Sequence, residues 1–377
     1  MIRTTFSGVG AAMLFLLAAS CSTSAASEET SADAELVSSI DVRPFTTIGT
    51  GRPGAEENDI NTPDGVVFDA NGSLLLTDAK NHRVQVWDVR TTRRLGQFGS
   101  PEIFHGDIVD LAVSPRSGQL VVTDESAHVA YAFDPPSPDD AGELALTNYR
   151  FTGKDMFAEY DLKKVGGVTF DSKGRIYTVD ARKNLVSRYD AEGNPDPTFQ
   201  FVEKGSVAFL RGCEGIAVDE KRGNLYVASE ADSVVRVFDL EDGSYKQQMI
   251  GRRSDSARAG TPVGKSVFQA AVEGLWIIDD YLLASDESDG GTGRVLIFDL
   301  NEPSVFDHDA DDYARLQQAN ERSGYVGSFG SFCSPDSVAA FTDADGESYV
   351  AVADQCHYQV PVYKWSDIQR AGRFGRQ

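Results

Sequence analysis

The sequence has few cysteines, few histidines and few basic residues. Its four Cys and five His form no HExxH motif and no Cys-His spacing typical of zinc sites. It contains no Gly-x-Ser-x-Gly, phosphate loop or dinucleotide fingerprint, so nucleotide-binding enzymes and α/β-type serine hydrolases have no support. With 35 Lys and Arg against 58 Asp and Glu, the formal net charge is −23. We therefore expect no nucleic-acid partner.

Long hydrophobic runs are missing apart from Phe6–Ala19, which is too short for a comfortable membrane span. The segment resembles a bacterial lipoprotein signal peptide over residues 1–20, which implies lipid on Cys21. An ordinary cleaved signal is the alternative. Residues 21–40 are then a lipidated Cys and a flexible tether, and Ser22 resembles the pattern of outer-membrane lipoproteins. We expect a bacterial cell-envelope protein that touches the membrane only through its lipid.

Three further cysteines would lie in an oxidising compartment. Cys333 and Cys356 flank an expected strand pair near the C-terminus and are candidates for a disulfide, which would leave Cys213 as a buried thiol. Spacing does not fix connectivity, so bridged and unbridged forms both remain open.

A unit of three short strands recurs along the chain. In Cys213–Asp239 its strands are Ile216–Val218, Leu225–Ala228 and Val234–Phe238, joined by polar turns. Six such units begin near Asp64, Val109, Gly166, Glu214, Glu273 and Asp336.

Short, evenly repeated strands favour radial closure. We predict an all-β fold over residues 41–377, a six-bladed β-propeller of four-stranded antiparallel blades. Asp41–Ile48 should close the ring against the last blade, and Asp311–Glu321 is the one helix expected.

Two resemblances follow from the motifs. Residues 63–88, PDGVVFDANGSLLLTDAKNHRVQVWD, are similar to the NHL repeat, which implies a six-bladed propeller but no particular activity. Residues 211–365 resemble the β-propeller phytases. The positions that carry this second resemblance are Glu214-Gly215, Asp219-Glu220, Gly223, Leu225-Tyr226, Glu230, Glu273-Gly274-Leu275, Tyr281–Ser285, Asp336 and Tyr349–Asp354. Ala271 and Gln355-Cys356-His357 depart from the phytase pattern, which leaves the full set of calcium sites open.

Acidic residues recur where each unit's first strand begins and where its second strand ends. These two positions are neighbours in an antiparallel pair, so in a propeller they would surround one channel mouth. The acids before the first strand are Asp64, Glu214, Glu273 and Asp336, and those after the second are Asp78, Asp124, Asp180, Glu230, Asp286, Glu287 and Asp354. Asp78, Asp124 and Asp180 are expected instead to cap the turns that follow them.

Crowded carboxylates repel one another unless a cation neutralises them, and hard oxygen donors suit Ca²⁺. We therefore predict Ca²⁺ at this mouth. Its expected ligands are Glu214, Glu230, Glu273, Asp336, Asp64 and Asp354.

The phytase resemblance implies Ca²⁺-dependent hydrolysis of a small phosphorylated substrate. It suggests catalytic roles for Glu214, Glu230, Glu273 and Glu287. Arg211, Lys265 and Arg294 are candidates to bind phosphate, or are plain surface cations. Two other functions remain open: a non-catalytic NHL-like propeller that binds an envelope protein or glycan, and another metal-dependent propeller hydrolase of lactonase type. A monomer is expected.

Overall fold

The structure is a computed structural model that describes residues 39–157, 162–199, 210, 212–251, 267–288, 292–302, 305–306 and 324–375. All of these residues belong to one compact unit, Val37–Gln377. The expected signal peptide, Cys21 and the expected helix Asp311–Glu321 lie outside the described residues. Within them, no helix is both long enough and apolar enough to cross a membrane.

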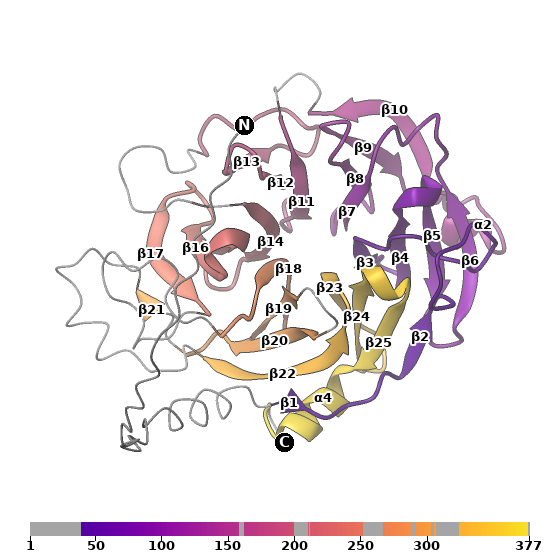
Figure 1. The fold of residues 1–377 in the computed structure, drawn as a ribbon. Helices are drawn as coiled ribbons and strands as arrows, with labels where there is room; N and C mark the ends of the chain where they lie inside the picture. Colours follow the sequence, from indigo (N-terminus) through magenta and orange to yellow (C-terminus); the bar gives the residue numbers. More distant parts are fainter. Residues whose placement is uncertain are drawn as a thin grey trace, which may run out of the picture. The chain divides into compact units, whose positions relative to one another are not determined.

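Six sheets, whose strands pair antiparallel except at the outer edge of one sheet, stand around a common axis, which confirms the predicted six-bladed propeller (Figure 1). The first blade comprises β3 (Val66–Phe68), β4 (Ser73–Asp78), β5 (Arg83–Asp88) and β6 (Arg93–Phe98). The second comprises β7 (Ile108–Val113), β8 (Leu120–Asp124), β9 (Val129–Asp134) and β10 (Arg150–Met156). The third shows three strands among the described residues, β11 (Val165–Phe170), β12 (Ile176–Asp180) and β13 (Leu185–Tyr189).

The remaining blades follow the same order from the axis outward. The fourth comprises β14 (Cys213–Asp219), β15 (Asn224–Ser229), β16 (Val234–Asp239), β17 (Tyr245–Ile250) and the short β21 (Val305–Phe306). The fifth comprises β18 (Ala271–Ile278), β19 (Tyr281–Glu287), β20 (Gly293–Asp299), β22 (Tyr325–Phe332) and β1 (Ser39–Ile40). The sixth comprises β23 (Pro335–Thr342), β24 (Ser348–Asp354), β25 (Val360–Lys364) and β2 (Thr46–Ile48).

The N-terminal strands close the ring. β2 is the outermost strand of the sixth blade, where Thr46 lies opposite Val362 of β25, as the sequence predicted for Asp41–Ile48. β1 pairs in parallel with β22, with Ser39 opposite Ser328. The expected tether of residues 21–40 therefore ends too late, because its last two residues belong to a sheet.

Apolar side chains fill the space between neighbouring blades. The aromatic residues that end the third strands are buried there, as Phe133, Phe238 and Phe298 show. Trp276 of β18 packs against three different interblade clusters, including the one between the first and second blades. Since β18 belongs to the fifth blade, the Trp276 indole must reach into the central channel, where it lines a cavity of about 250 Å³.

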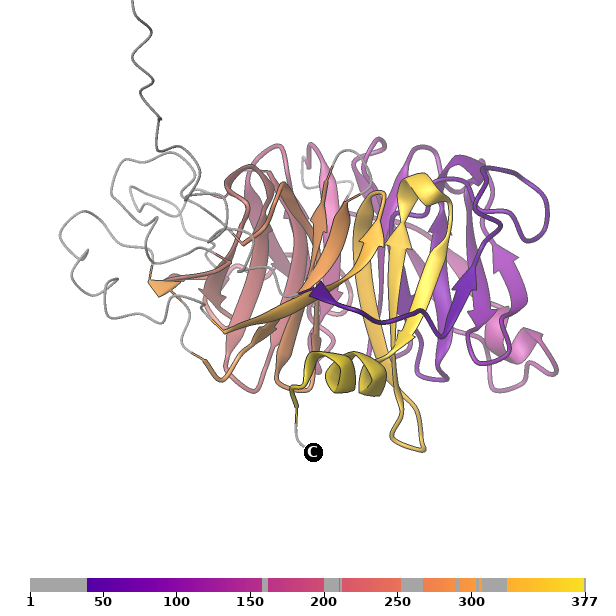
Figure 2. The same ribbon diagram turned by 60° about the horizontal axis from the view of Figure 1, so that its bottom comes forward.

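Two short helices were not predicted. α2 spans Leu144–Thr147, and α4 spans Trp365–Gly372 directly after β25. Trp365 packs edge-on against Tyr281 and Phe374, and Ile368 one turn later is also buried, so tertiary contacts on one face hold this short helix. Figure 2 shows α4 at the end of the sixth blade opposite to the 3-10 turn η5 (Gln355–His357).

Candidate functional site

A cavity of about 370 Å³ opens at the mouth of the channel, on the side of η1 (Ala79–Asn81), η2 (Glu230–Asp232) and η5. Its walls are the starts of the innermost strands and the loops that follow the second strands. The carboxyl groups that line it are those of Asp64, Asp107, Asp110, Glu125, Glu214, Glu230, Glu273, Glu287 and Asp336. Lys80 and Lys164 are the lining cations among the described residues. The cavity therefore carries a large excess of acidic groups.

β-Bulges aim the innermost acids into this cavity. The pairing of β14 with β15 shifts register between Cys213 and Ile216, and that of β18 with β19 shifts between Val272 and Leu275. Glu214 and Glu273 lie inside these shifts. A bulge leaves backbone groups unpaired and redirects the local side chain.

In the fifth blade, a hydroxyl from the neighbouring strand satisfies a backbone group freed by the bulge, because Ser285 Oγ accepts the Gly274 N–H at 2.7 Å. In the first blade, whose β3–β4 pairing has no register shift, Thr77 Oγ1 accepts the Gly65 N–H at 2.9 Å in the same way. Each bond supports the backbone next to a cavity acid.

The glycine of each Glu-Gly pair is needed because the next blade lies against it. A Cβ on Gly215 would come within 2.0 Å of the Glu273 carbonyl oxygen, and one on Gly274 within 2.6 Å of the Asp336 carbonyl oxygen. The glycines therefore have a packing role. The glutamates, whose carboxylates face the cavity, are not explained by packing.

Burial and mutual repulsion raise the pKa values of the innermost acids. Burial is the larger cause for Glu273 and Asp336, whose pKa values lie well above their usual range, and neighbouring carboxylates add to it. The pKa of Glu214 is also raised by burial, although Lys164 opposes the shift. Burial raises the pKa of Asp64 to about 6 and that of Asp110 to about 7. These groups therefore bind a proton more readily than an exposed carboxyl group does.

The two lysines act as internal partners for part of this charge. Lys164 Nζ lies 2.7 Å from Glu214 Oε1 and 3.5 Å from Glu125 Oε1. Although burial alone would lower the pKa of Lys164, these carboxylates raise it. Lys80 Nζ lies 2.6 Å from Asp107 Oδ1. Glu214 of the fourth blade reaches Lys164 of the third blade past Gly166, which has no side chain to block the contact.

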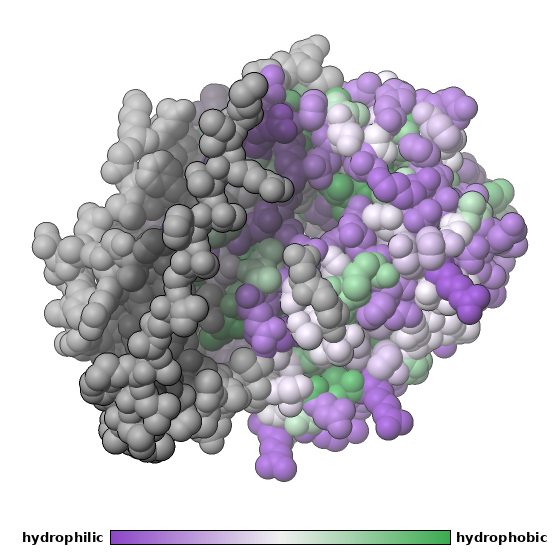
Figure 3. Space-filling view, viewed as in Figure 1, coloured by the Kyte–Doolittle hydropathy of each residue, from purple (hydrophilic) through white to green (hydrophobic). Residues whose placement is uncertain are grey.

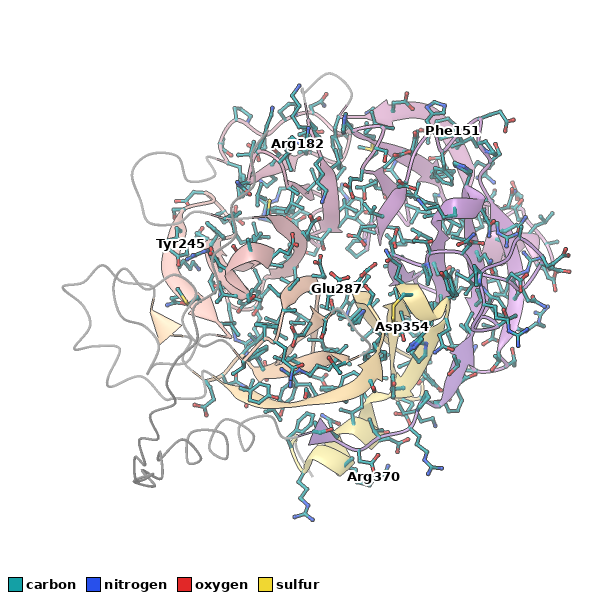
Figure 4. All side chains as sticks on the ribbon, viewed as in Figure 1. Phe151, Arg182, Tyr245, Glu287, Asp354 and Arg370 are labelled. Carbon is teal, nitrogen blue, oxygen red and sulfur yellow. A yellow bond between two sulfur atoms is a disulfide. The ribbon has the colours of Figure 1, made fainter. Side chains whose placement is uncertain are left out.

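The acids at the ends of the second strands divide into two sets. Asp124 and Asp180 cap the turns that follow them, as expected, because they accept the N–H groups of Ala127 and of Arg182 and Lys183. The turn after Asp78 has no such cap, so the expectation for Asp78 is wrong. Five aspartates instead share another role, since each accepts an N–H group of the segment that leads into the first strand of its blade: Asp78, Asp124, Asp180, Asp286 and Asp354. Asp354 accepts the N–H groups of Cys333 and Ser334, and its other oxygen lies 2.7 Å from His357 Nδ1. Asp354 does not line the cavity, so its predicted role as a Ca²⁺ ligand is wrong. In Figure 4, Glu287 lies nearer to the centre of the ring than Asp354 does.

After the second strands, the acids that line the cavity stand one residue after the position that Asp124, Asp286 and Asp354 occupy in their blades. Ser229 ends β15, so Glu230 corresponds to Glu125, Glu287 and Gln355, and not to Asp78 as the sequence alignment of the repeats implied. Five of the lining residues were not predicted, either for this reason or because they have no counterpart in the other repeats: Lys80, Lys164, Asp107, Asp110 and Glu125. Lys164 could have been found, because it stands two residues before Gly166 and strand side chains alternate between two faces.

None of the predicted phosphate-binding cations is found in the cavity among the residues that the structure describes. Arg294 is buried in β20, where it pairs with Asp286 at 3.1 Å and donates to the Val267 carbonyl oxygen. Its expected role in binding phosphate is therefore wrong. Arg211 and Lys265 lie outside the described residues.

Cys333 and Cys356 form a disulfide beside the cavity, with Cα atoms 5.6 Å apart. Cys213 is free and buried, with its Sγ near the carbonyl oxygen of Asp180. Burial raises the pKa of the Cys213 thiol to about 12, so it remains protonated at neutral pH.

The donor chemistry of the cavity suits a hard cation, because its acidic groups offer only oxygen ligands. In the absence of a cation, however, no three His, Cys, Asp or Glu side chains of the described residues stand close enough together to hold a metal ion. A bound cation would therefore have to draw carboxylates from several blades together.

The surface around the cavity offers no broad apolar patch within the described ranges. Phe45 and Leu144 are their exposed large hydrophobic residues, and they belong to different blades. Figure 3 shows mostly hydrophilic residues on the coloured part of this face, with small hydrophobic areas between them.

The comparisons with known proteins agree with this architecture. The NHL repeat family matches residues 61–87. Protein brain tumor of Drosophila melanogaster is 29% identical over 149 residues, which are 38% of this chain and 13% of that protein.

Two solved structures resemble the fold. Kuenenia stuttgartiensis hydrazine synthase aligns with a TM-score of 0.51 and 11% identity, over 84% of this chain and 99% of that chain. A structural genomics protein of unknown function from Bacteroides thetaiotaomicron aligns with a TM-score of 0.52 and 14% identity, over 84% of this chain and 73% of that chain. These likenesses concern the fold alone. The chain is thus a six-bladed β-propeller with an NHL repeat in its first blade.

Proposed function

We propose that this propeller binds Ca²⁺ in its acidic cavity and, with the ion bound, hydrolyses phosphomonoesters. The observation that supports the proposal is the convergence of Glu214, Glu230, Glu273 and Glu287 on one cavity. These four glutamates come from the fourth and fifth blades and are the residues for which the phytase resemblance suggests catalytic roles.

The electrostatics of the cavity favour uptake of a divalent cation. Buried carboxyl groups with raised pKa values hold protons that a cation can displace. Ca²⁺ accepts irregular sets of six to eight oxygen ligands, whereas Mg²⁺ demands near-ideal octahedral geometry. Glu214, Glu230, Glu273, Asp336 and Asp64 are the proposed ligands.

Bound Ca²⁺ would supply Lewis-acid chemistry, polarising phosphate oxygens and lowering the pKa of a bound water. The chain itself would contribute positioning and charge. Lys80 and Lys164 line the cavity and are suited to hold the negative charge of a phosphate once a cation occupies their carboxylate partners.

The N-terminal sequence supports an exported protein held at the bacterial envelope by lipid on Cys21. Metabolic labelling with a fatty acid tests this part of the proposal. Label should be incorporated by the natural chain and lost in Cys21→Ser.

Phosphate release from phytate and from an aryl phosphate, with Ca²⁺ and with chelator, tests the activity. We expect release that requires Ca²⁺ and disappears in Glu214→Gln and Glu230→Gln. Glu192→Gln is the matched control, since Glu192 is exposed on a loop outside the cavity lining. Release that persists in chelator, or in both cavity variants, would contradict the proposal.

A non-catalytic binding module is the second candidate. It is favoured by the NHL repeat and by the pairing of both cavity lysines with carboxylates. In that case Ca²⁺ would raise the melting temperature while no phosphate is released. The binding surface would be polar, since the described residues offer no broad apolar patch.

A further inference from the structure

The sixth blade contacts cavity carboxylates on both of its neighbours. Ser334 Oγ donates to Glu287 Oε1 of the fifth blade at 2.5 Å. Gln355 Nε2 donates to Asp64 Oδ1 of the first blade, also at 2.5 Å. Ser334 Oγ further lies 3.3 Å from Oδ1 of Asp336 in its own blade. Two uncharged side chains therefore hold three of the cavity acids.

The disulfide joins the residues next to these two side chains. Cys333 precedes Ser334 in the segment leading into β23, and Cys356 follows Gln355 in η5. Hydrogen bonds join the same two segments as the disulfide does. The Gln355 N–H donates to the Ser334 carbonyl oxygen at 2.8 Å, and the Cys333 N–H donates to Asp354 Oδ1 at 2.9 Å.

No other blade has such a covalent link among the described residues. The second blade joins the same two segments through Asp124, which accepts the Gly106 N–H, and the third through Asp180, which accepts the Lys163 N–H. The sixth blade keeps this aspartate as Asp354 and adds the disulfide. The reinforcement thus falls on the blade whose loops hold acids of two neighbours.

We propose that the Cys333–Cys356 disulfide clamps Ser334 and Gln355 as positioning residues for the carboxylates of Glu287, Asp336 and Asp64, and so sets the cation affinity of the cavity. This inference rests on the proposed binding of Ca²⁺. Side chains that orient metal ligands typically change metal affinity 10- to 100-fold when they are removed. Loss of the disulfide frees the two segments that carry Ser334 and Gln355. A cation that binds must then order these segments, which lowers its affinity.

The clamp also makes the site sensitive to reduction. Cys356 is exposed, so a dithiol can reach the bond. The dithiol supplies two electrons and two protons, the S–S bond breaks into two thiols, and the dithiol becomes a cyclic disulfide. The oxidised protein is therefore the form with high cation affinity.

Calorimetric titration of the whole protein with Ca²⁺ tests the inference. We expect Cys333→Ala/Cys356→Ala to bind Ca²⁺ roughly 10- to 100-fold more weakly than the oxidised protein. Reduced natural protein should match the double variant, and the double variant should not respond to dithiol. That insensitivity excludes an effect through Cys213. Ser334→Ala and Gln355→Ala keep the disulfide and should each reproduce part of the loss.

Hydrogen exchange of the amides in 333–336 and 354–358, measured without Ca²⁺, separates the two proposals. Faster exchange in a double variant that still melts cooperatively supports the clamp. If neither protein binds Ca²⁺ but exchange accelerates, the proposed function and the effect on cation affinity fail, and only the positioning of Ser334 and Gln355 by the disulfide stands. Measurable and equal Ca²⁺ affinity in the oxidised protein and the double variant, or unchanged exchange, overturns the clamp.

Discussion

The carboxyl groups of Asp64 and Asp336 lie close to each other across the seam between the first and last blades, so that each influences the pKa of the other. Burial is the main cause that raises both pKa values. The charge of Asp64 raises the pKa of Asp336 further, whereas the neighbouring Asp336 lowers that of Asp64. The first blade packs against the sixth at this seam, next to the sheet in which β2 pairs with β25. Repulsion between two charged carboxylates there opposes the packing of these two blades.

This relationship predicts an unusual dependence of stability on pH. An acid whose folded pKa exceeds its unfolded value stabilises the fold at low pH, and this contribution is lost as pH rises through the folded pKa. Asp64, with a pKa of about 6, and Asp110, with one of about 7, act in this direction, as do Glu214, Glu273 and Asp336. Without Ca²⁺, the melting temperature should therefore rise by several degrees as the pH falls from 8 to 5.5.

Acids with lowered pKa values work against this trend only at lower pH. The pKa of Glu241 is about 2, because Arg175 and Lys173 bind it, so its contribution is lost only below about pH 4. Asp336→Asn should flatten the dependence between pH 5.5 and 8, and saturating Ca²⁺ should do the same. A natural protein whose melting temperature falls steadily over that acidification would refute this account.

Asp286 and Glu287 are neighbours in sequence with opposite expected effects. Asp286 pairs with buried Arg294 and accepts the Gln269 N–H, so Asp286→Asn should lower the free energy of unfolding by about 3 kcal/mol. Glu287 lines the cavity, so Glu287→Gln should leave stability within about 0.5 kcal/mol and weaken Ca²⁺ binding. Urea unfolding and calorimetry measure the two effects. Similar stability losses in both variants would mean that both acids are structural.

Lys164 neutralises part of the cavity charge. Lys164→Met leaves Glu214 without its partner, so we expect a loss of about 1 to 2 kcal/mol at pH 8 and less at pH 5, where the acids are more protonated. Ca²⁺ should raise the melting temperature of this variant more than that of the natural protein. Lys173→Met removes an exposed cation from a surface pair and serves as control. Equal losses in both variants at pH 8 would show that Lys164 acts only as a surface charge.

Gly215 tests the packing of blade against blade. A Cβ there would meet the Glu273 carbonyl oxygen at 2.0 Å, and backbone must move to accept it. Gly215→Ala should therefore cost about 2 to 4 kcal/mol by thermal or urea unfolding. Gly223→Ala meets no neighbouring atom but has a φ of +63°, so it should cost about 1 kcal/mol. A smaller loss at Gly215 than at Gly223 would contradict the close approach.

The repeating strands were predictable because each blade buries both faces of its sheet and ends its third strand in an aromatic residue, such as Phe238 or Phe298. Ring closure by the segment before Ile48 was predictable for a related reason. The last blade has only three strands of its own, and the first strands of the chain supply the missing edge.

The finer arrangement of the site was not predictable, because bulges shift the register. Glu214 faces the cavity from within a bulge that a regular alternation of strand residues does not contain. The one-residue offset between Glu230 and Asp78 likewise appears only once β15 is seen to end at Ser229. Arg294 shows that a basic residue in a strand gives no sign in the sequence that it faces a buried aspartate and not the channel.

Trp276 lies deeper in the channel than the acidic cavity, where its indole lines a second cavity of about 250 Å³. A molecule that approaches from the side of η1, η2 and η5 therefore meets the acidic mouth first. An ion held among the innermost acids would lie beneath any larger molecule above it. Binding would then be ordered, with ions arriving first and leaving last, and a ligand at the mouth would slow the exchange of the ions below it.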